Sequence, residues 1–143
     1  MFETIGDIWE YPPTDTIVIT TNGSLTKDGR AVIGRGVAKQ AVLRFPALAE
    51  ILGSMIAREG SHVFDLGSGI VSFPVEDTAW SLPDLRIIAR SAQELRSLAD
   101  RSGWRRIIVP RPGCGGGGLA WKDVRPLLEP WLDDRFTVIS AFM

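Results

Sequence analysis

The sequence predicts an α/β protein whose central sheet lies between two layers of helices. Short apolar runs rich in β-branched residues, such as 17–19 and 107–109, are typical of strands that are buried on both faces. Segments with helical spacing of apolar residues, such as 83–98, alternate with these runs along the chain. This alternation favours a three-layer α/β/α sandwich, which we expect to contain a mixed sheet and to form one domain over residues 1–143.

Two strands and two helices are predicted in the N-terminal half. They are strands at 1–5 and 16–20 and helices at 36–45 and 47–58. Pro46 interrupts the helical pattern, because proline lacks the backbone N–H that a helix interior needs, and it therefore separates the two helices.

In the C-terminal half, alternating residues at 62–66 and 70–73 flank the turn Gly67-Ser68-Gly69. Alternation on both sides of a glycine turn predicts a β-hairpin. The remaining predicted elements are a helix at 83–98, a strand at 105–109, a helix at 121–132 and a strand at 136–142.

Composition and charge exclude several classes of protein. The formal net charge of −1 argues against a general nucleic-acid surface, which needs a basic field. The single cysteine, Cys114, cannot form an internal disulfide, and the single histidine, His62, gives little support to a zinc site or a Ser-His-Asp triad. No apolar run reaches membrane-spanning length. We therefore expect a cytoplasmic protein that has no membrane contact.

A glycine-rich segment at 113–118 is the most informative feature of the chain, since five of its six residues are glycine. It follows the predicted strand at 105–109 and precedes the predicted helix at 121–132. Such a loop can present backbone N–H groups and a helix N-terminus to an anion, and glycine leaves room for the backbone to approach a phosphate. A flexible linker is the alternative interpretation, although linkers of that kind usually carry serine.

Another glycine turn, Gly34-Arg35-Gly36, lies earlier in the chain and is thus the first of two glycine loops; it precedes the predicted helix at 36–45. Two glycine loops that each open a helix could hold a diphosphate from two sides. Neither loop is a Walker motif, because no Gly-Lys-Ser/Thr follows. Neither fits the dinucleotide-binding fingerprint, because the third glycine and the acidic ribose partner are missing.

Four short motifs, taken in order, resemble those of macrodomains, which are ADP-ribose-binding modules with an α/β/α sandwich. The motifs are Gly6-Asp7-Ile8, the run 18–22, the run 34–38 and Pro110-Arg111-Pro112-Gly113-Cys114-Gly115. The last of these motifs resembles the corresponding loop of one macrodomain branch, which includes terminal ADP-ribose glycohydrolases and ADP-ribose 1''-phosphate phosphatases.

This resemblance implies specific roles for individual residues. Asp7 would accept a hydrogen bond from the adenine amino group, Ile8 would offer its backbone N–H, Asn22 would contact the distal ribose, and Phe142 would stack on adenine. The residues implied to hold the diphosphate are Gly34, Arg35, Gly36, Val37, Gly113, Cys114, Gly115, Gly116 and Gly117. The residues alone leave alternatives open: a helix N-cap for Asp7, a turn for Asn22 and a core aromatic for Phe142.

The chain departs from the glycohydrolases of this branch, which carry an aspartate in the second glycine loop. That position falls at Gly117 here, and no carboxylate lies between Pro110 and Trp121. Asn22, Asp28 and Lys39 are the remaining polar candidates for catalysis, and Asn22 and Lys39 are the two that we retain. Cys114 at a glycine loop is interpreted as a packing residue rather than a nucleophile.

The function that we expect first is the binding of ADP-ribose or a related NAD-derived metabolite, without a cofactor or metal. The alternative is a hydrolase, either an ADP-ribose 1''-phosphate phosphatase or an enzyme that removes ADP-ribose from macromolecules. A third interpretation sets the resemblance aside and assigns a general nucleotide-phosphate domain. ADP-ribosylated macromolecules are further candidate partners, and we expect a monomer.

Overall fold

The computed structural model describes residues 1–141. Five strands form one sheet in the order β1-β5-β4-β2-β3. The strands are β1 (Phe2–Ile5), β2 (Thr16–Thr21), β3 (Ile70–Pro74), β4 (Ile107–Pro110) and β5 (Phe136–Ser140). The helices are η1 (Ile8–Glu10, a 3-10 turn), α1 (Val37–Arg44), α2 (Leu48–Glu59), α3 (Leu85–Ser102) and α4 (Trp121–Leu128).

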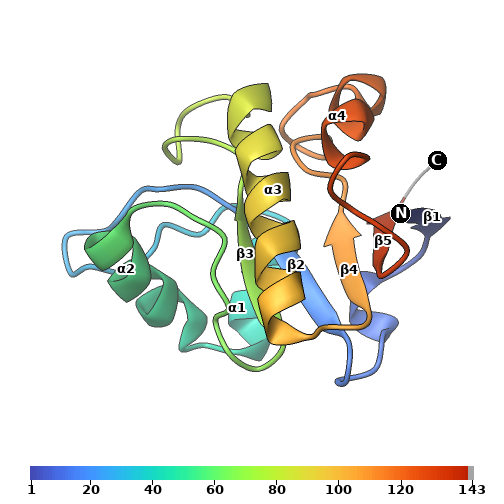
Figure 1. Ribbon diagram of the computed structural model, residues 1–143. Helices are drawn as coiled ribbons and strands as arrows, with labels where there is room; N and C mark the ends of the chain where they lie inside the picture. The colour runs from blue at the N-terminus through green and yellow to red at the C-terminus, as the bar shows by residue number, and fades with distance from the viewer. Residues whose placement is uncertain (142–143) are drawn as a thin grey trace.

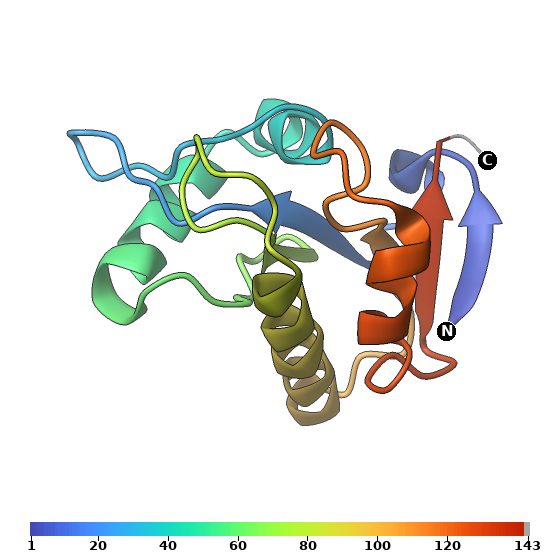
Figure 2. The ribbon, with the colours of Figure 1, turned by 90° about the horizontal axis from the view of Figure 1, so that it is seen from above.

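Helices cover both faces of the sheet, which confirms the predicted three-layer sandwich (Figure 1). Seen from above, α3 and α4 lie on one side of the strands and α1 lies on the other (Figure 2). Each side has its own apolar core. Val18 of β2 packs toward α3 and α4, whereas its neighbours Ile17 and Ile19 pack toward α1 and α2. This period of two explains why the run Ile17–Ile19 of this doubly covered strand is apolar at every position.

The sheet is parallel rather than mixed, and this corrects the prediction. All four strand pairs run parallel, including β2 with β3 from Ile17↔Ile70 to Thr21↔Pro74. Every residue of β3 is buried, so this edge strand is covered on both faces where it pairs with β2 and does not form a solvent-facing hairpin.

The predicted hairpin at 62–73 is therefore wrong. Its turn exists, but the two arms share only an isolated bridge between Asp65 and Val71. The first arm uses side chains instead of a strand partner: the backbone N–H of Val63 donates to Glu94 at 3.0 Å, and that of Phe64 donates to Ser72 at 2.9 Å. The sequence pattern thus predicted the turn correctly but gave residues 70–73 the wrong partner, because their partner is β2 and not residues 62–66.

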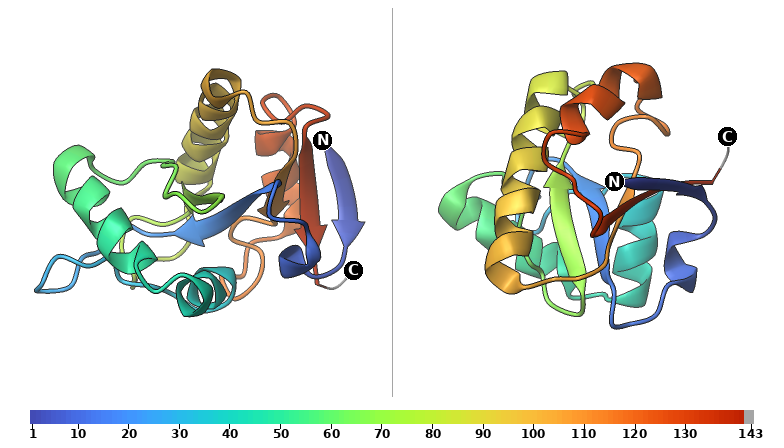
Figure 3. Two further views of the ribbon diagram at one scale, coloured as in Figure 1. Left: turned by 90° about the horizontal axis from the view of Figure 1, so that it is seen from below. Right: turned by 45° about the vertical axis from the view of Figure 1, so that its right-hand side comes forward.

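Parallel strands bring the loops that follow them to a common edge of the sheet. β1 and β5 lie side by side at one end of the sheet, with η1 directly after β1 (Figure 3). β3 forms the opposite end. No single described helix is long and apolar enough to cross a membrane; α1 and α2 reach that length and composition only together, with a bend of 115° between them.

Candidate functional site

A cleft of about 1030 Å³ opens at the carboxyl ends of the three strands β4, β2 and β3. Its walls come from the segments after each of these strands and from the start of α1. In Figures 2 and 3 the loop between β4 and α4 lies beside α1, so the two glycine-rich segments face each other across this site. Ligands of open parallel sheets bind at this edge.

The glycine loop between β4 and α4 combines packed and open positions. A side chain at Gly113 would collide with Leu119, and one at Gly117 would collide with Pro83 and with the carbonyl of Gly113, so close packing fixes the shape of the loop. Gly115 and Gly116 behave differently, since an added Cβ would meet nothing within 4 Å. Neither of these two residues forms a hydrogen bond within the described part of the chain. Their N–H groups are therefore available to an anion in the cleft.

The start of α1 provides the opposite wall. Gly36 occupies the N-cap with φ of 73°, a conformation that favours glycine, and it supplies no side-chain cap. The first-turn N–H groups at Val37 and Ala38 consequently lack a capping partner. Arg35 and Lys39 line the same cleft, and neither has an ion pair with any described residue. Uncapped amides and unpaired cations together form a positive wall.

Asn22 lies at the base of the cleft and is almost fully buried. Its Nδ2 donates to the carbonyl of Val32 at 3.0 Å, and its Oδ1 accepts from the N–H of Ser24 at 2.9 Å. Asn22 thus ties the loop after β2 to the segment that enters the first glycine turn. This is the turn role that the sequence left open, and it does not test the ribose contact.

Asp7 and Ile8 lie outside the cleft wall, after β1 at the other end of the sheet. Asp7 caps η1, because its Oδ1 accepts from the N–H of Trp9 at 2.9 Å. The indole of Trp9 donates to Gln40 of α1 at 2.7 Å, so this turn is held against the helix that begins the positive wall. The predicted adenine contacts of Asp7 and Ile8 stay predictions.

The remaining predicted residues fall in three different places. Cys114 packs against the core and does not line the cleft, and burial raises the pKa of its thiol above the ordinary value, an effect that Arg111 opposes. This agrees with a packing residue, because the thiolate is the reactive form. Asp28 lies in the loop after β2, where it accepts from Thr26 and pairs with Arg30. Phe142 lies outside the described residues.

Among the cleft-lining residues that sequence reasoning missed are Glu76, Trp80 and Arg111. Glu76 and Trp80 belong to the segment between β3 and α3, and burial raises the pKa of Glu76 above its ordinary value of 4.5. Trp80 is 84% exposed. The one sequence signal for Glu76 was its position directly after the apolar run at 70–75, which is too common among surface charges to single it out.

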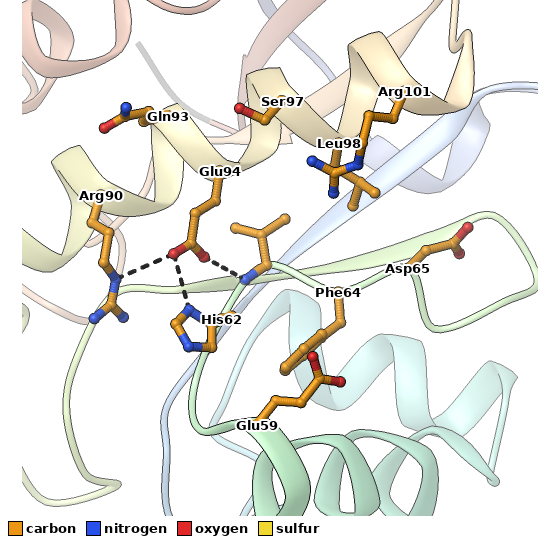
Figure 4. A pocket seen from close by; sticks show the side chains of 11 residues that line it. Glu59, His62, Phe64, Asp65, Arg90, Gln93, Glu94, Ser97, Leu98 and Arg101 are labelled. Carbon is orange, nitrogen blue, oxygen red and sulfur yellow. Dashed lines mark hydrogen bonds and ion pairs between the residues drawn. The ribbon is translucent and has the colours of Figure 1, made fainter.

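A second cavity of about 580 Å³ lies elsewhere on the molecule, between α3 and the segment before β3. Figure 4 shows Glu94 at its centre. The Nδ1 atom of His62 is 2.9 Å from this carboxylate, and Arg90 lies 3.7 Å from it. Glu94 also accepts from the backbone N–H of Val63. This network explains how the first arm of the expected hairpin is held without a strand partner.

The arrangement of strands, helices and cleft is that of a macrodomain, which confirms the predicted fold class. The macrodomain of Thermus aquaticus DarG matches with a TM-score of 0.78 and 22% identity, over 96% of this chain and 95% of that chain. A second solved structure, Thermosipho africanus DarTG in complex with ADP-ribose, matches with a TM-score of 0.77 and 18% identity. That match covers 96% of this chain and 41% of the longer DarTG chain.

Among curated proteins, the chain is similar to the ADP-ribose glycohydrolase OARD1 of Bos taurus. The two are 24% identical over 146 residues, which is 94% of this chain and 88% of OARD1. No protein-family profile matches the sequence. The resemblance to macrodomains that the four motifs carried is therefore matched by similarity along nearly the whole chain.

Proposed function

We propose that this protein binds ADP-ribose or a closely related nucleoside-diphosphate sugar in the cleft between the two glycine loops. The observation that carries this proposal is the pair of facing walls. One wall holds the unpartnered N–H groups of Gly115 and Gly116, and the other holds the uncapped start of α1. A diphosphate matches both walls, because oriented amides and helix N-termini favour negative charge.

The charges in the cleft agree with an anionic ligand. Arg35 and Lys39 line it without a carboxylate partner, and Arg111 contributes a third cation, which lies 4.0 Å from Glu3. The similar structure of DarTG contains ADP-ribose, and the similar OARD1 is an ADP-ribose glycohydrolase. Both support ADP-ribose over a simpler nucleotide as the ligand of this chain.

The same proposal covers the partners, the oligomeric state and the cellular location of the protein. The free metabolite is the ligand that we propose first, and ADP-ribosylated macromolecules would present the same group at the open side of the cleft. We also propose that the protein acts as a monomer in the cytoplasm. Hydrolysis that depends on a loop aspartate is not favoured, because glycine occupies position 117.

Isothermal titration calorimetry tests the proposal. The titrants are ADP-ribose, ADP-ribose 1''-phosphate, NAD and ATP, each against the whole chain. We expect ADP-ribose to bind at least about tenfold more tightly than ATP, a difference of about 1.4 kcal/mol. Equal or tighter binding of ATP would favour a general nucleotide-phosphate domain, and no binding of any titrant would refute the proposed ligand class.

A further inference from the structure

Two side chains that line the cleft, Glu76 and Trp80, are unpartnered in the described part of the chain. Both belong to the segment between β3 and α3. Among the described residues of the cleft lining, Glu76 carries the one carboxylate and Trp80 carries the one aromatic ring. This end of the cleft therefore differs in chemistry from the two glycine walls, which are positive.

Glu76 is half-buried, yet it has neither a hydrogen bond nor an ion pair with any residue that the structure describes. The cations Arg35, Lys39 and Arg111 line the same cleft, and none of them pairs with it. A carboxylate that is withdrawn from water without a partner costs free energy. A cation that arrives with a ligand would remove this cost.

Trp80 is more exposed than any other large apolar side chain of the described residues. Its indole has no hydrogen bond, ring contact or cation–π contact with them. The faces of the ring are therefore free at the rim of the cleft. Of the aromatic side chains, tryptophan attracts cations most strongly, and its ring also stacks on flat ligands.

The backbone that carries these two side chains is fixed. Hydrogen bonds of 2.9–3.0 Å join Val75, Asp77 and Ala79 to residues 21–24 of the loop after β2. Figure 2 shows the two segments side by side, the one after β3 in yellow-green and the one after β2 in blue. A fixed backbone with uncommitted side chains is the arrangement that a recognition site needs.

A flat cation matches both side chains at once. A neutral flat ring would stack on Trp80 but would leave Glu76 unpaired. A pyridinium ring stacks through its face, and its positive charge attracts both the indole and the carboxylate. The pair therefore favours a planar aromatic cation over a neutral ring of the same shape.

The order of strands places this pair at one end of a ligand. The glycine loop between β4 and α4 and the segment after β3 lie on opposite sides of β2. The turn at Asp7 follows β1, at the other end of the sheet. A ligand with its adenosine toward β1 and its diphosphate between the glycine loops would extend its distal ribose toward Glu76 and Trp80. This orientation rests on the proposed function.

We propose that Glu76 and Trp80 form a subsite for a flat cationic ring that is attached to the distal ribose of the ligand. The oxidised dinucleotide NAD⁺ carries such a ring, a pyridinium, at this position. NADH is its matched counterpart, because its dihydropyridine ring has the same carboxamide and no charge. The protein therefore binds the oxidised dinucleotide in preference to the reduced one.

Isothermal titration calorimetry of the whole chain with NAD⁺, NADH and ADP-ribose at neutral pH tests the subsite. We expect NAD⁺ to bind at least about fivefold more tightly than NADH, the gain that one cation–π contact and one charge pair provide. ADP-ribose, which has no ring on its distal ribose, reports binding to the rest of the cleft.

Glu76→Gln keeps the shape of the side chain and removes its charge. We expect this variant to lose about fivefold in NAD⁺ affinity and to keep its affinities for NADH and ADP-ribose within about twofold. Asp77→Asn is the matched control, because it removes an exposed carboxylate of the same segment outside the cleft lining. It should keep the wild-type preference for NAD⁺.

Trp80→Ala removes the ring face. We expect NAD⁺ affinity to fall about 3–30-fold and NADH affinity to fall less, since the neutral ring loses stacking but no cation–π attraction. ADP-ribose affinity should stay within about twofold of the wild-type value, because no ring of this ligand reaches the subsite. Leu82→Ala is the control, as Leu82 is an exposed apolar residue of the same segment that does not line the cleft.

The preference should also depend on pH through Glu76. Burial raises the pKa of Glu76 above its ordinary value of 4.5, and only the charged carboxylate attracts a pyridinium. We expect the ratio of NAD⁺ affinity to ADP-ribose affinity to fall as pH is lowered through this pKa, and Glu76→Gln to show no such fall. The other charged groups of the cleft lining and of the segment up to α3 are the same in both proteins: Arg35, Lys39, Arg111, Asp77 and Asp84.

Three results would overturn the inference. The first is equal affinity of the wild type for NAD⁺ and NADH. The second is an equal loss of NAD⁺ and ADP-ribose affinity in Glu76→Gln, which would assign Glu76 to the ribose hydroxyls. The third is an equal loss of both in Trp80→Ala, which would place adenine on the indole. Each leaves the proposed ligand intact, whereas failure of the wild type to bind ADP-ribose would remove the proposed function itself.

Discussion

At the scale of single residues, several polar side chains around the cleft are already engaged in structure. Asn22 uses both ends of its amide, and Asp7 uses one carboxylate oxygen as a helix cap. Experiments on these residues must therefore distinguish a loss of ligand contact from a loss of folding stability. Substitutions that keep one role and remove the other make this separation possible.

Asp7→Asn tests recognition of adenine. Asparagine can still cap η1 through its carbonyl oxygen, but its NH₂ group cannot accept a hydrogen bond from the adenine amine. We expect thermal stability close to wild type and a loss of about 1–3 kcal/mol in ADP-ribose binding, as for a hydrogen bond to a charged group. The inosine analogue carries a carbonyl oxygen in place of the amine, so the substitution should not weaken its binding, because the asparagine amide can donate to this oxygen and a carboxylate cannot. Equal affinity of the wild type for the two ligands would contradict the assigned role.

Asn22→Ala tests the tie between the loop after β2 and the first glycine turn. The variant leaves the carbonyl of Val32 and the N–H of Ser24 without this partner. Because these groups are partly buried, we expect the free energy of unfolding to fall by about 1–3 kcal/mol. Urea denaturation measures it. An unchanged unfolding midpoint and slope would show that the tie contributes nothing to stability.

At the scale of elements, the glycines of the loop between β4 and α4 differ in what they do. Gly113 is required by its φ of 73° and its closeness to Leu119, and Gly117 is required by close packing against Pro83, whereas Gly115 is open and has no positive φ. Gly113 and Gly117 thus maintain the shape of the loop, whereas Gly115 lies on the surface that we expect to bind ligand. A substitution at Gly115 probes the binding surface alone.

Gly115→Val should weaken ADP-ribose binding at least about tenfold, because two methyl groups would occupy the space of a phosphate. Stability should stay within about 0.5 kcal/mol, as at other open surface positions. Ala120→Val is the matched control, since it adds the same methyl groups at an exposed position outside the cleft. Wild-type affinity in a folded Gly115→Val protein would show that phosphate does not approach this loop.

The edge strand β1 offers a test of electrostatics between elements. A hydrogen bond from Arg125 of α4 lowers the pKa of Glu3 below 4.5, an effect stronger than the opposing effect of burial, and Trp121 adds a second hydrogen bond. A lowered pKa in the folded state stabilises the protein above the unfolded pKa. This stabilisation is lost as pH falls through the folded pKa.

We therefore expect the free energy of unfolding of the wild type to fall more steeply below about pH 4.5 than that of Glu3→Gln. Urea denaturation over a series of pH values provides the comparison. Glu59→Gln is the control, because Glu59 is exposed and has no ion pair with any described residue. Parallel pH curves for wild type and Glu3→Gln would exclude a contribution from this contact.

At the scale of the whole molecule, the layers and most elements could be predicted from local patterns. Buried strands at 16–20 and 105–109 and the long helix at 83–98 were visible because apolar periodicity reports burial directly. The parallel pairing of β3 could not be found this way, since Gly67 and Gly69 favour a turn whether or not the flanking arms pair. Strand partners depend on the whole sheet, and no local pattern encodes them.

The candidate site was predictable only in part, for a similar reason. Glycine loops stand out in a sequence because they are unusual, so both walls of the cleft were identified. Glu76 did not stand out, because one glutamate after an apolar run resembles any surface charge. Glu76 lines the cleft because the topology places the end of β3 beside Asn22.

The central claim is that ADP-ribose lies between the two glycine loops. The most direct measurement is a titration of ¹⁵N-labelled protein with ADP-ribose, followed by amide chemical shifts. We predict saturable shifts that are largest at Gly115, Gly116 and Val37, with no comparable change around His62 and Glu94. Saturable binding with its largest shifts at the His62–Glu94 cavity, and unchanged amides in the glycine loops, would contradict the account.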